Sequence, residues 1–509
     1  MCSSDLGSLS GLVTEDRVAD LPLNGRNFND LTLLQTGVNE SRTSGTSGSI
    51  NGTQYSSNGA PTRSNNFTID GTIMNDLNNS GPASTNENTL GVEGIREFRV
   101  VTNSFSAEYG MNMGSQVILV TKSGTNQMHG SVFEFLRNSA LDARNWTDGA
   151  VQPGFRRNNF GASLGGPLKT DKTFYFANFE GLRQTRTSTL QGTTPTPAAR
   201  AGANVVEAVK PYLALLPLPT GETLAGGVGR YSNAIADVQR EDFGQARADH
   251  TFNAADSFFA RYTIDHATDA LPALIPGIST DFTTRNQWLT FSENHIFSPT
   301  LLNTFRASFT RTHYVAVGNA IQNAALSFSP GQQVGTLGIS GVSDIAPPGV
   351  TPNDINQRLF SYSDDLFYVR GRHSLKFGTL INRYDDLNFT ATNINGTMNF
   401  ASVATFLTGQ PTSYNAITPG SNLNKDYRFM TFGFYLQDDL RLLPTLTLNL
   451  GLRYEAHTVP SEKDGNSAAL RDVRNDATTT VGPIFENMSL KNFSPRFGFA
   501  WDIGGQGKM

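Results

Sequence analysis

The chain has 509 residues, a formal net charge of -5 at pH 7 and a pI near 5.8. This acidic balance gives no support for nucleic-acid binding, which favours basic surfaces. Charged residues make up 16% of the chain, below the roughly 25% that is usual for soluble domains. The single cysteine, Cys2, excludes an internal disulfide framework and a cysteine-based zinc site. No run of about 18 apolar residues is present, so the sequence predicts no transmembrane helix.

Residues 1–8 read MCSSDLGS and lack the basic start and apolar core of a secretory signal peptide. They look like a translated sequencing adaptor. We therefore interpret them as a non-native leader and leave them out of the fold argument.

Residues 9–125 alternate between short apolar runs and polar tracts. The runs include LTLLQTGV, IREFRVVT and SQVILVTKSG, and they are separated by stretches rich in Gly, Ser and Asn, such as SRTSGTSGSINGTQYSSNGA. This texture predicts a compact α/β unit with long loops.

From about residue 130 the dominant pattern has a period of two, which is typical of β-strands. In FGFYLQDDLRLLPTLTLNLGLRYE (432–455), the residues from Leu446 to Tyr454 alternate between apolar side chains and Thr447, Asn449, Gly451 and Arg453. Runs of this length exceed the roughly 5–6 residues of a common strand. We predict about twelve such strands, near 130–137, 158–165, 173–183, 242–252, 256–266, 284–297, 301–314, 357–369, 373–387, 427–440, 445–456 and 493–503.

The links between these strands alternate between long and short. Links such as 138–157, 184–241, 267–283, 315–356 and 388–426 are long, whereas NAA (253–255), SPT (298–300) and RGR (370–372) are short. In an up-and-down antiparallel sheet this places every long loop on one rim, as in outer-membrane barrels. The pattern therefore favours a transmembrane barrel with strands of about 9–11 residues. A long two-layer antiparallel sheet in a secreted protein stays open as the alternative.

Several long blocks resemble TonB-dependent outer-membrane receptors, and within them the Oar-like subgroup. LPLNGRNFNDLTLLQTGV (21–38) and FTIDGTIMND (67–76) resemble the plug domain of that family. Residues 94–138 resemble the end of the plug and the first barrel strand. FYLQDDLRLLPTLTLNLGLRYE and NFSPRFGFAWD (492–502) resemble barrel hairpins. The similarity covers nearly the whole chain from about residue 14.

The resemblance implies a mainly β fold, with an N-terminal α/β plug at 9–125 inside a transmembrane antiparallel β-barrel. Residues 126–509 would supply about twelve of an expected 22 strands. We expect a fragment that lacks the N-terminal extension, the TonB box and the C-terminal strands. The implied location is the bacterial outer membrane.

The resemblance also implies a function. A receptor of this family imports a scarce or bulky substrate, using energy that TonB and the inner-membrane energising complex transmit to the plug. The implied partners are thus TonB, outer-membrane lipid and an unknown small-molecule, glycan or peptide substrate. Two alternatives stay open: a non-transporting outer-membrane adhesin or structural barrel, and a secreted β-rich glycan-binding protein.

The polar tract 41–66 and the loop 75–90 are the parts of the plug that we expect to face a substrate. Their Asn, Ser and Thr side chains suit hydrogen bonding to a polar ligand, although both segments could equally be mobile loops. The candidate residues are Asn66, Asp76, Asn78, Asn79 and Glu87. The spacing of Asp76, Asn78, Ser80 and Glu87 also matches a calcium loop weakly, because hard oxygen ligands fall at positions 1, 3, 5 and 12.

We predict no enzymatic activity and no cofactor. GASLG (161–165) matches the G-x-S-x-G pattern, but the strand-turn-helix context that a nucleophile elbow needs is missing. No phosphate-binding G-x-x-x-x-G-K-[ST] and no H-E-x-x-H motif is present. Arg96, Arg99, Glu97 and Glu108 could form ion pairs between plug and barrel, or could equally belong to a solvated face. Residues 197–217 are the best helix candidate.

Overall fold

The computed structural model describes residues 9–14, 26–41, 54–78, 81–86, 89–103, 105–143, 152–347, 352–485 and 488–503. The predicted leader, residues 1–8, lies outside them. No helix in these ranges has the length and apolar character needed to cross a membrane.

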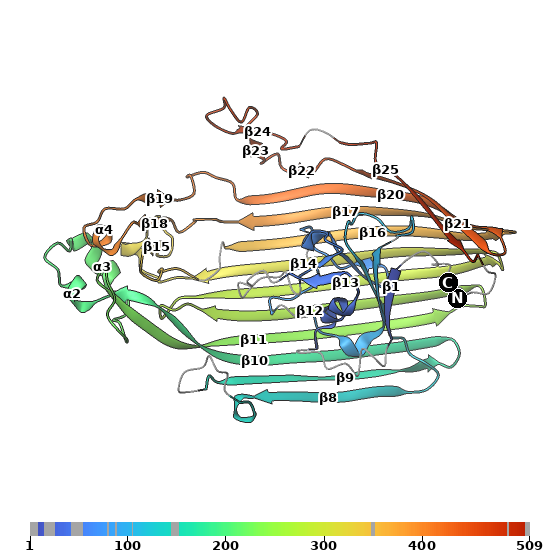
Figure 1. Ribbon diagram of the computed structural model, residues 1–509, viewed down its shortest axis with the longest axis horizontal. Coiled ribbons are helices and arrows are strands. Elements are labelled where there is room, and N and C mark those ends of the chain that lie inside the picture. The colour runs from blue at the N-terminus through green and yellow to red at the C-terminus, as the bar shows by residue number, and fades with distance from the viewer. Residues whose placement is uncertain are drawn as a thin grey trace.

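One large antiparallel sheet, which we call the barrel sheet, contains the predicted strands (Figure 1). Each long strand pairs with its neighbour along the chain, and the short β22 (Ser461–Glu462) pairs with β20. The long strands are β8 (His129–Asn138), β9 (Phe155–Lys169), β10 (Thr173–Pro195), β11 (Val228–Thr251), β12 (Asp256–Pro272), β13 (Ser279–Ser298), β14 (Leu301–Asn319), β16 (Asn353–Arg370), β17 (His373–Thr390), β20 (Asn424–Leu443), β21 (Leu446–His457) and β25 (Phe493–Trp501).

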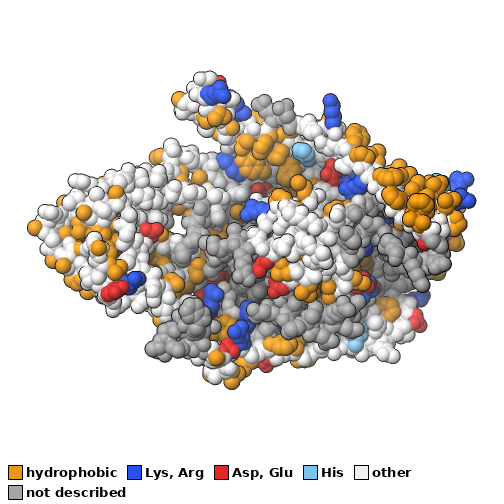
Figure 2. Space-filling view, in the orientation of Figure 1, with side chains coloured by type: hydrophobic (Ala, Val, Ile, Leu, Met, Phe, Trp, Pro, Cys, Tyr) orange, Lys and Arg blue, Asp and Glu red, His pale blue; other side chains and the backbone are white. Residues whose placement is uncertain are grey.

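The two faces of the barrel sheet differ as the period of two requires. On β21, Leu450 and Leu452 are exposed on the outer face, whereas Arg453 is buried on the inner face. On β25 the exposed side chains include Phe497, Phe499 and Trp501. Figure 2 shows hydrophobic side chains gathered over this end of the sheet. An apolar outer surface of this extent is typical of contact with lipid or a partner.

The strands run further than their sequence pattern indicates. Almost half of the predicted link 184–241 is strand, because β10 and β11 stay paired up to Pro195 and Val228. The predicted long link 267–283 shrinks to six residues, 273–278. The β10 extension, 184–195, consists mostly of Thr, Ser and Gln, so it lacks the apolar alternation that marks the rest of the strand. The short links remain at one end of the sheet, as predicted.

The N-terminal unit is built on a second sheet with the order β1-β6-β7-β4-β5. Its apolar face contains Phe98, Val100, Val117 and Leu119, all fully buried. The strands are β1 (Leu9–Thr14), β4 (Asn66–Ile69), β5 (Thr72–Ile73), β6 (Ile95–Asn103) and β7 (Gln116–Thr121); β2 (Val38–Glu40) and β3 (Tyr55–Ser57) form a hairpin. Helical structure in the described part of this unit consists of the 3-10 segments η2 (Phe28–Leu34), η3 (Thr62–Ser64) and η4 (Val92–Gly94). The expected α/β character thus takes the form of short 3-10 turns.

This unit lies against one face of the barrel sheet, toward the end with the short turns (Figure 1). Trp288 of β13, which is 1% exposed, joins its hydrophobic core. We call the unit the plug. Burial raises the pKa of Tyr55 in the plug core, where the Ser115 hydroxyl donates to the Tyr55 hydroxyl oxygen at 3.4 Å.

The links at the opposite end of the barrel sheet pack together around a second hydrophobic core, and we call this assembly the loop lobe. Leu213, Ile275 and Phe406 come from three different links and are buried together. The predicted helix at 197–217 is wrong as a single element, because two short helices and a 3-10 turn replace it. The elements in these links are α2 (Pro197–Arg200), η6 (Glu207–Val209), α3 (Lys210–Leu213), η7 (Ala324–Leu326), β15 (Thr336–Ile339), β18 (Thr397–Phe400), α4 (Val403–Leu407) and β19 (Ser413–Asn415).

Three small elements complete the described structure. The 3-10 turn η5 (Ser139–Leu141) follows β8, and β23 (Ala468–Ala469) pairs with β24 (Thr480–Val481) in the link before β25.

Candidate functional site

The plug is fastened to β10 by a buried ion pair. Arg26 Nε donates to Glu180 Oε1 at 3.0 Å, and its Nη2 donates to Glu93 Oε1 at 3.0 Å. The Glu180 side chain is fully buried and also accepts the Gly91 amide at 3.0 Å. The Arg26 guanidinium lies 4.2 Å from the centre of the Phe133 ring, close enough for a cation–π contact. Removing one partner of a buried ion pair costs about 3–5 kcal/mol, so this contact is a strong fastening.

A second buried ion pair ties the β4–β5 turn of the plug to β11 and β12. Arg261 Nε lies 2.8 Å from Asp70 Oδ2, and Arg247 Nη1 lies 3.5 Å from Asp70 Oδ1. Asp70 adopts a φ of +48°, which Asp tolerates better than most residues. The next residue, Gly71, has a φ of +80°, and a Cβ there would lie 2.5 Å from Arg306 Cζ. The turn therefore needs Asp-Gly to approach the barrel sheet so closely.

Neutral and charge-assisted hydrogen bonds also join the plug to β11, β13 and β14. We call the side of the plug that contacts β10 to β14 the first flank. Glu241 accepts from Ser84 Oγ at 2.8 Å and from Asn86 Nδ2 at 3.1 Å. The hydroxyls of Thr72 and Thr290 are 2.5 Å apart, and both residues are fully buried. Further contacts on this flank are Thr85 N to Thr284 Oγ1 at 3.0 Å, Asn286 Nδ2 to Ala83 O at 3.1 Å and Thr310 Oγ1 to Ile73 O at 2.7 Å.

On the opposite flank, β20, β21 and β25 bind the plug segment 105–111. Arg453 Nη1 donates to the carbonyls of Ala107 and Glu108, both at 3.2 Å. Gln437 Oε1 accepts the Ala107 amide at 2.6 Å, and Arg496 Nη1 donates to the Ser106 carbonyl. Arginine suits this role because its planar guanidinium can donate to several carbonyls at once.

Between the two flanks the plug stands away from β16 and β17, and a cavity of about 720 Å³ separates them. This volume falls within the roughly 300–1,000 Å³ of small-molecule sites. The rings of Tyr384 and Phe429 stack on its wall with centres 4.6 Å apart. Its charged lining residues are Asp70, Asp76, Glu108, Asp365, Arg247, Arg306 and Arg453.

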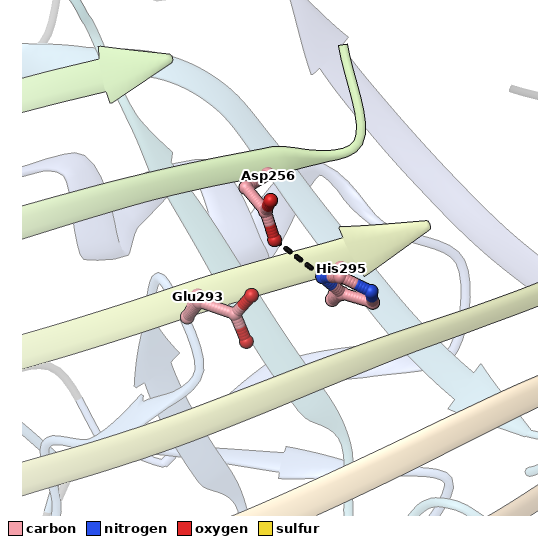
Figure 3. A group of neighbouring side chains, drawn as sticks. All are labelled: Asp256, Glu293 and His295. Atoms are coloured by element: carbon pink, nitrogen blue, oxygen red, sulfur yellow. Dashed lines mark hydrogen bonds and ion pairs between the residues drawn. The ribbon is translucent and has the colours of Figure 1, made fainter. Parts of the chain in front are cut away.

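A separate group of titratable side chains lies near the short turns. Asp256 of β12 and Glu293 and His295 of β13 bring their ligand atoms within 4.8 Å of one another (Figure 3). His295 Nδ1 and Asp256 Oδ1 form a short hydrogen bond. On β12 the inner-face residues that meet the plug are Arg261 and its odd-numbered neighbours. Asp256 therefore belongs to the outer face, on the side away from the plug and the cavity.

The family model described as "Outer membrane beta barrel domain" matches residues 120–509. The chain belongs to this family. Its barrel sheet accordingly lies in the bacterial outer membrane, with the apolar face toward lipid and the polar face toward the plug. The mainly β architecture predicted from the sequence is confirmed.

Comparison with individual proteins shows that this chain is similar to several outer-membrane transporters and receptors. Over 141 residues this chain is 32% identical to the TonB-dependent transporter Oar of Myxococcus xanthus. The aligned region covers 24% of this chain and 12% of that protein. The outer membrane transporter YddB of Escherichia coli matches with a TM-score of 0.63 at 13% identity, covering 98% of this chain and 59% of that one. The siderophore receptor PirA of Acinetobacter baumannii gives 0.54 at 14% identity, over 89% and 58%. The chain thus spans less than two thirds of each of these proteins.

The structure of this outer membrane β-barrel places three of the five predicted substrate-facing residues. Asn66 and Asp76 line the cavity, and Asn78 is exposed at the end of the same segment. Asn79 and Glu87 lie outside the described residues. So does Ser80, which leaves the calcium-loop spacing a prediction.

Sequence reasoning missed most of the fastening residues. Of the four charged residues proposed for ion pairs between plug and barrel, Glu108 does lie 3.6 Å from Lys376 of β17. Arg96 and Glu97 pair with each other at 3.9 Å on an exposed part of the plug. Arg26 and Asp70 sit in the quoted blocks LPLNGRNF and FTIDGT, but their partners are more than 150 residues away. A charged residue within a strand that alternates between polar and apolar side chains, such as Glu180 or Arg261, is the sequence pattern that could have identified these contacts.

Proposed function

We propose that the protein is a TonB-dependent receptor of the Oar-like subgroup that takes up a substrate across the outer membrane. The observation that carries this proposal is the plug, which is bound to the inner face of an outer-membrane barrel by buried ion pairs. A wide barrel would leave an open channel unless its lumen were filled. The 32% identity to the Myxococcus xanthus transporter over part of the chain supports the same reading.

In this proposal residues 9–125 form the plug that closes the lumen, and residues 126–509 form the barrel that surrounds it. The partners are TonB and the inner-membrane energising complex, which would pull on the plug. The substrate would meet the plug at Asn66, Asp76 and Asn78, together with Asn79 and Glu87 of the same loop. Its chemical class stays open between small molecule, glycan and peptide.

Closed and open states would differ in the contacts between plug and barrel. The closed state described here holds the plug by ion pairs whose loss costs several kcal/mol each, so random thermal opening would be rare. An external force is therefore a physically reasonable means of opening the gate. The chain has no phosphate-binding motif to supply that energy itself.

The proposed uptake is tested by comparing which compounds disappear from the culture medium of cells with and without the gene. Cells carrying the gene and cells lacking it are incubated in spent medium, with and without a protonophore, and the medium is analysed by mass spectrometry. We expect one or a few compounds to disappear only with the gene and an intact proton gradient. A structural barrel or adhesin would give no energy-dependent difference, and that result would contradict the proposal.

A further inference from the structure

The fastening of the plug to the barrel sheet is uneven around its circumference. Along β10 to β14 the contacts include two buried ion pairs and the Thr72–Thr290 hydroxyl pair. Along β20 to β25 the arginines Arg453 and Arg496 hold plug carbonyls. The strands β16 and β17 between these flanks face the large cavity instead.

Three contacts that cross from the plug to β16 and β17 are each weaker than the buried ion pairs on β10 to β12. The Leu77 amide donates to Gln357 Oε1 at 2.9 Å. Glu108 and Lys376 form an ion pair at 3.6 Å in which the side chains are 26% and 23% exposed, and Asn382 Nδ2 lies 3.9 Å from Met111 Sδ. A neutral hydrogen bond, a partly exposed ion pair and a contact to sulfur each contribute less than a fully buried ion pair.

One short plug segment, residues 74–78, separates the large cavity from two smaller ones, and we call it the septum. Asp76 borders all three cavities, and the smaller two hold about 10 Å³ each, room for about one water molecule. The septum thus borders cavities at Asp76 and Leu77, whereas Met74 is buried in the plug core and Asn75 Nδ2 donates to Asn65 O at 2.9 Å. The residues just before it, Thr72 and Ile73, are held by β13 and β14.

We propose that the substrate passes between the plug and strands β16 and β17, and that the passage opens by displacement of the septum while the plug stays bound to β10–β14. This inference rests on the proposed uptake function and names its route. Acidic and basic side chains share the lining with apolar and aromatic ones such as Leu119, Tyr384 and Phe429. A solute that carries both polar and apolar groups fits such a lining.

Two cross-links between plug and barrel sheet distinguish this route from release of the whole plug. The first joins Leu77→Cys to Gln357→Cys across the septum, and the second joins Thr72→Cys to Thr290→Cys on the fastened flank. Both are closed as disulfides by the same mild oxidant in a Cys2→Ser background, which is clean because Cys2 is the single native cysteine. The matched controls are the four single-cysteine variants treated with the same reagent.

The readout is the KCl current through the intact protein in a planar lipid bilayer, with urea added to loosen the plug. We expect the Leu77–Gln357 link to lower the current at least tenfold, and the Thr72–Thr290 link to leave at least half of it. Equal suppression by both links would mean that the plug leaves as a whole. An unchanged current with the Leu77–Gln357 link, or no current in the unlinked protein, would also overturn the route.

The bilayer measurement contains no energising partner. A failure of the proposed uptake function in cells would therefore leave this current unaffected, whereas a wrong route would show in the current alone.

Discussion

Single buried charges determine how firmly the plug is held. Glu180 is surrounded by protein and depends on Arg26 for its counter-charge. We expect Arg26→Met to weaken plug docking by about 3–5 kcal/mol, because it leaves Glu180 buried without a cation. The measurement is urea unfolding followed by the fluorescence of Trp288, which is buried in the plug core, in a background where the other two tryptophans, Trp146 and Trp501, are changed to Phe.

The matched control for this change is Arg96→Met. Arg96 pairs with Glu97 on the surface of the plug, where both side chains are nearly half exposed. Its loss is expected to cost less than about 1 kcal/mol. Similar effects of the two variants would contradict the assignment of Arg26, and Arg26→Met combined with Glu180→Gln should recover most of the loss.

Tyr55 gives the plug a pH dependence of its own. Burial raises its pKa above the ordinary value of 10, because the phenolate would have to form in the plug core. The unfolded plug loses this proton near pH 10 and the folded plug only at higher pH. The stabilising effect is therefore complete below pH 10 and is lost as the pH rises above it, by up to about 1.4 kcal/mol per pH unit.

Tyr55→Phe should remove this contribution. We expect the variant to lose less plug stability than the parent between pH 10 and pH 11.5, in the same urea titration. An identical slope in parent and variant would show that Tyr55 ionises equally in both states.

At the scale of single residues, the sequence predicts which face of a sheet a side chain occupies better than it predicts which distant residue that side chain binds. The alternation predicts that Arg453 lies on the face opposite to Leu450 and Leu452, as it does, because the period of a strand is fixed by its backbone. The partner of Arg453 is a plug carbonyl more than 340 residues away, and no local pattern encodes it. The same holds for Arg26 with Glu180.

Strands β10 and β11 extend beyond their predicted boundaries, so the link between them that can be deleted is shorter than predicted. Removing 196–227 and joining Pro195 to Val228 through Asn-Gly should leave the barrel sheet intact, because β10 and β11 are paired up to those residues. Removing 184–241 would also delete Glu241, which holds Ser84 and Asn86 of the plug. We expect the first deletion to keep heat-modifiable migration in SDS gels, and the second to release the plug to proteolysis.

The shorter deletion should still have a distant effect on the loop lobe. It removes Val209, Leu213 and Leu216 from a core shared with Phe406 and Ile339. We expect faster protease cleavage within 391–423 and 320–347 in the deletion variant than in the parent. Unchanged cleavage of both links would mean that each loop folds independently.

Elements with strong periodicity were predictable because their pattern is local. The twelve long strands and the tight turns between them follow from alternation and from links such as NAA and RGR. The loop lobe was not predictable, since its core is assembled from apolar residues in four separate links that each read as irregular. The broken helix at 197–217 belongs to this case, because packing against Phe406 and its neighbours replaces helical continuity.

The whole molecule combines a barrel sheet with a plug that occupies its inner face. The order of long and short links correctly indicated which rim carries the loops, and the resemblance correctly indicated a plug. The uneven fastening of the plug and the cavity beside β16 and β17 depend on contacts between distant segments, so they required the structure.

The most direct test of this account is the sidedness of two matched exposed alanines. Ala203 lies in the loop lobe and Ala254 in a short turn. Each is changed to cysteine in a Cys2→Ser background, and intact cells are treated with a membrane-impermeant maleimide. We predict that Ala203→Cys is labelled on intact cells, and that Ala254→Cys is labelled only after the outer membrane is permeabilised. Labelling of Ala254→Cys on intact cells would contradict the orientation, and with it the plug as a gate between the loop lobe and the periplasm.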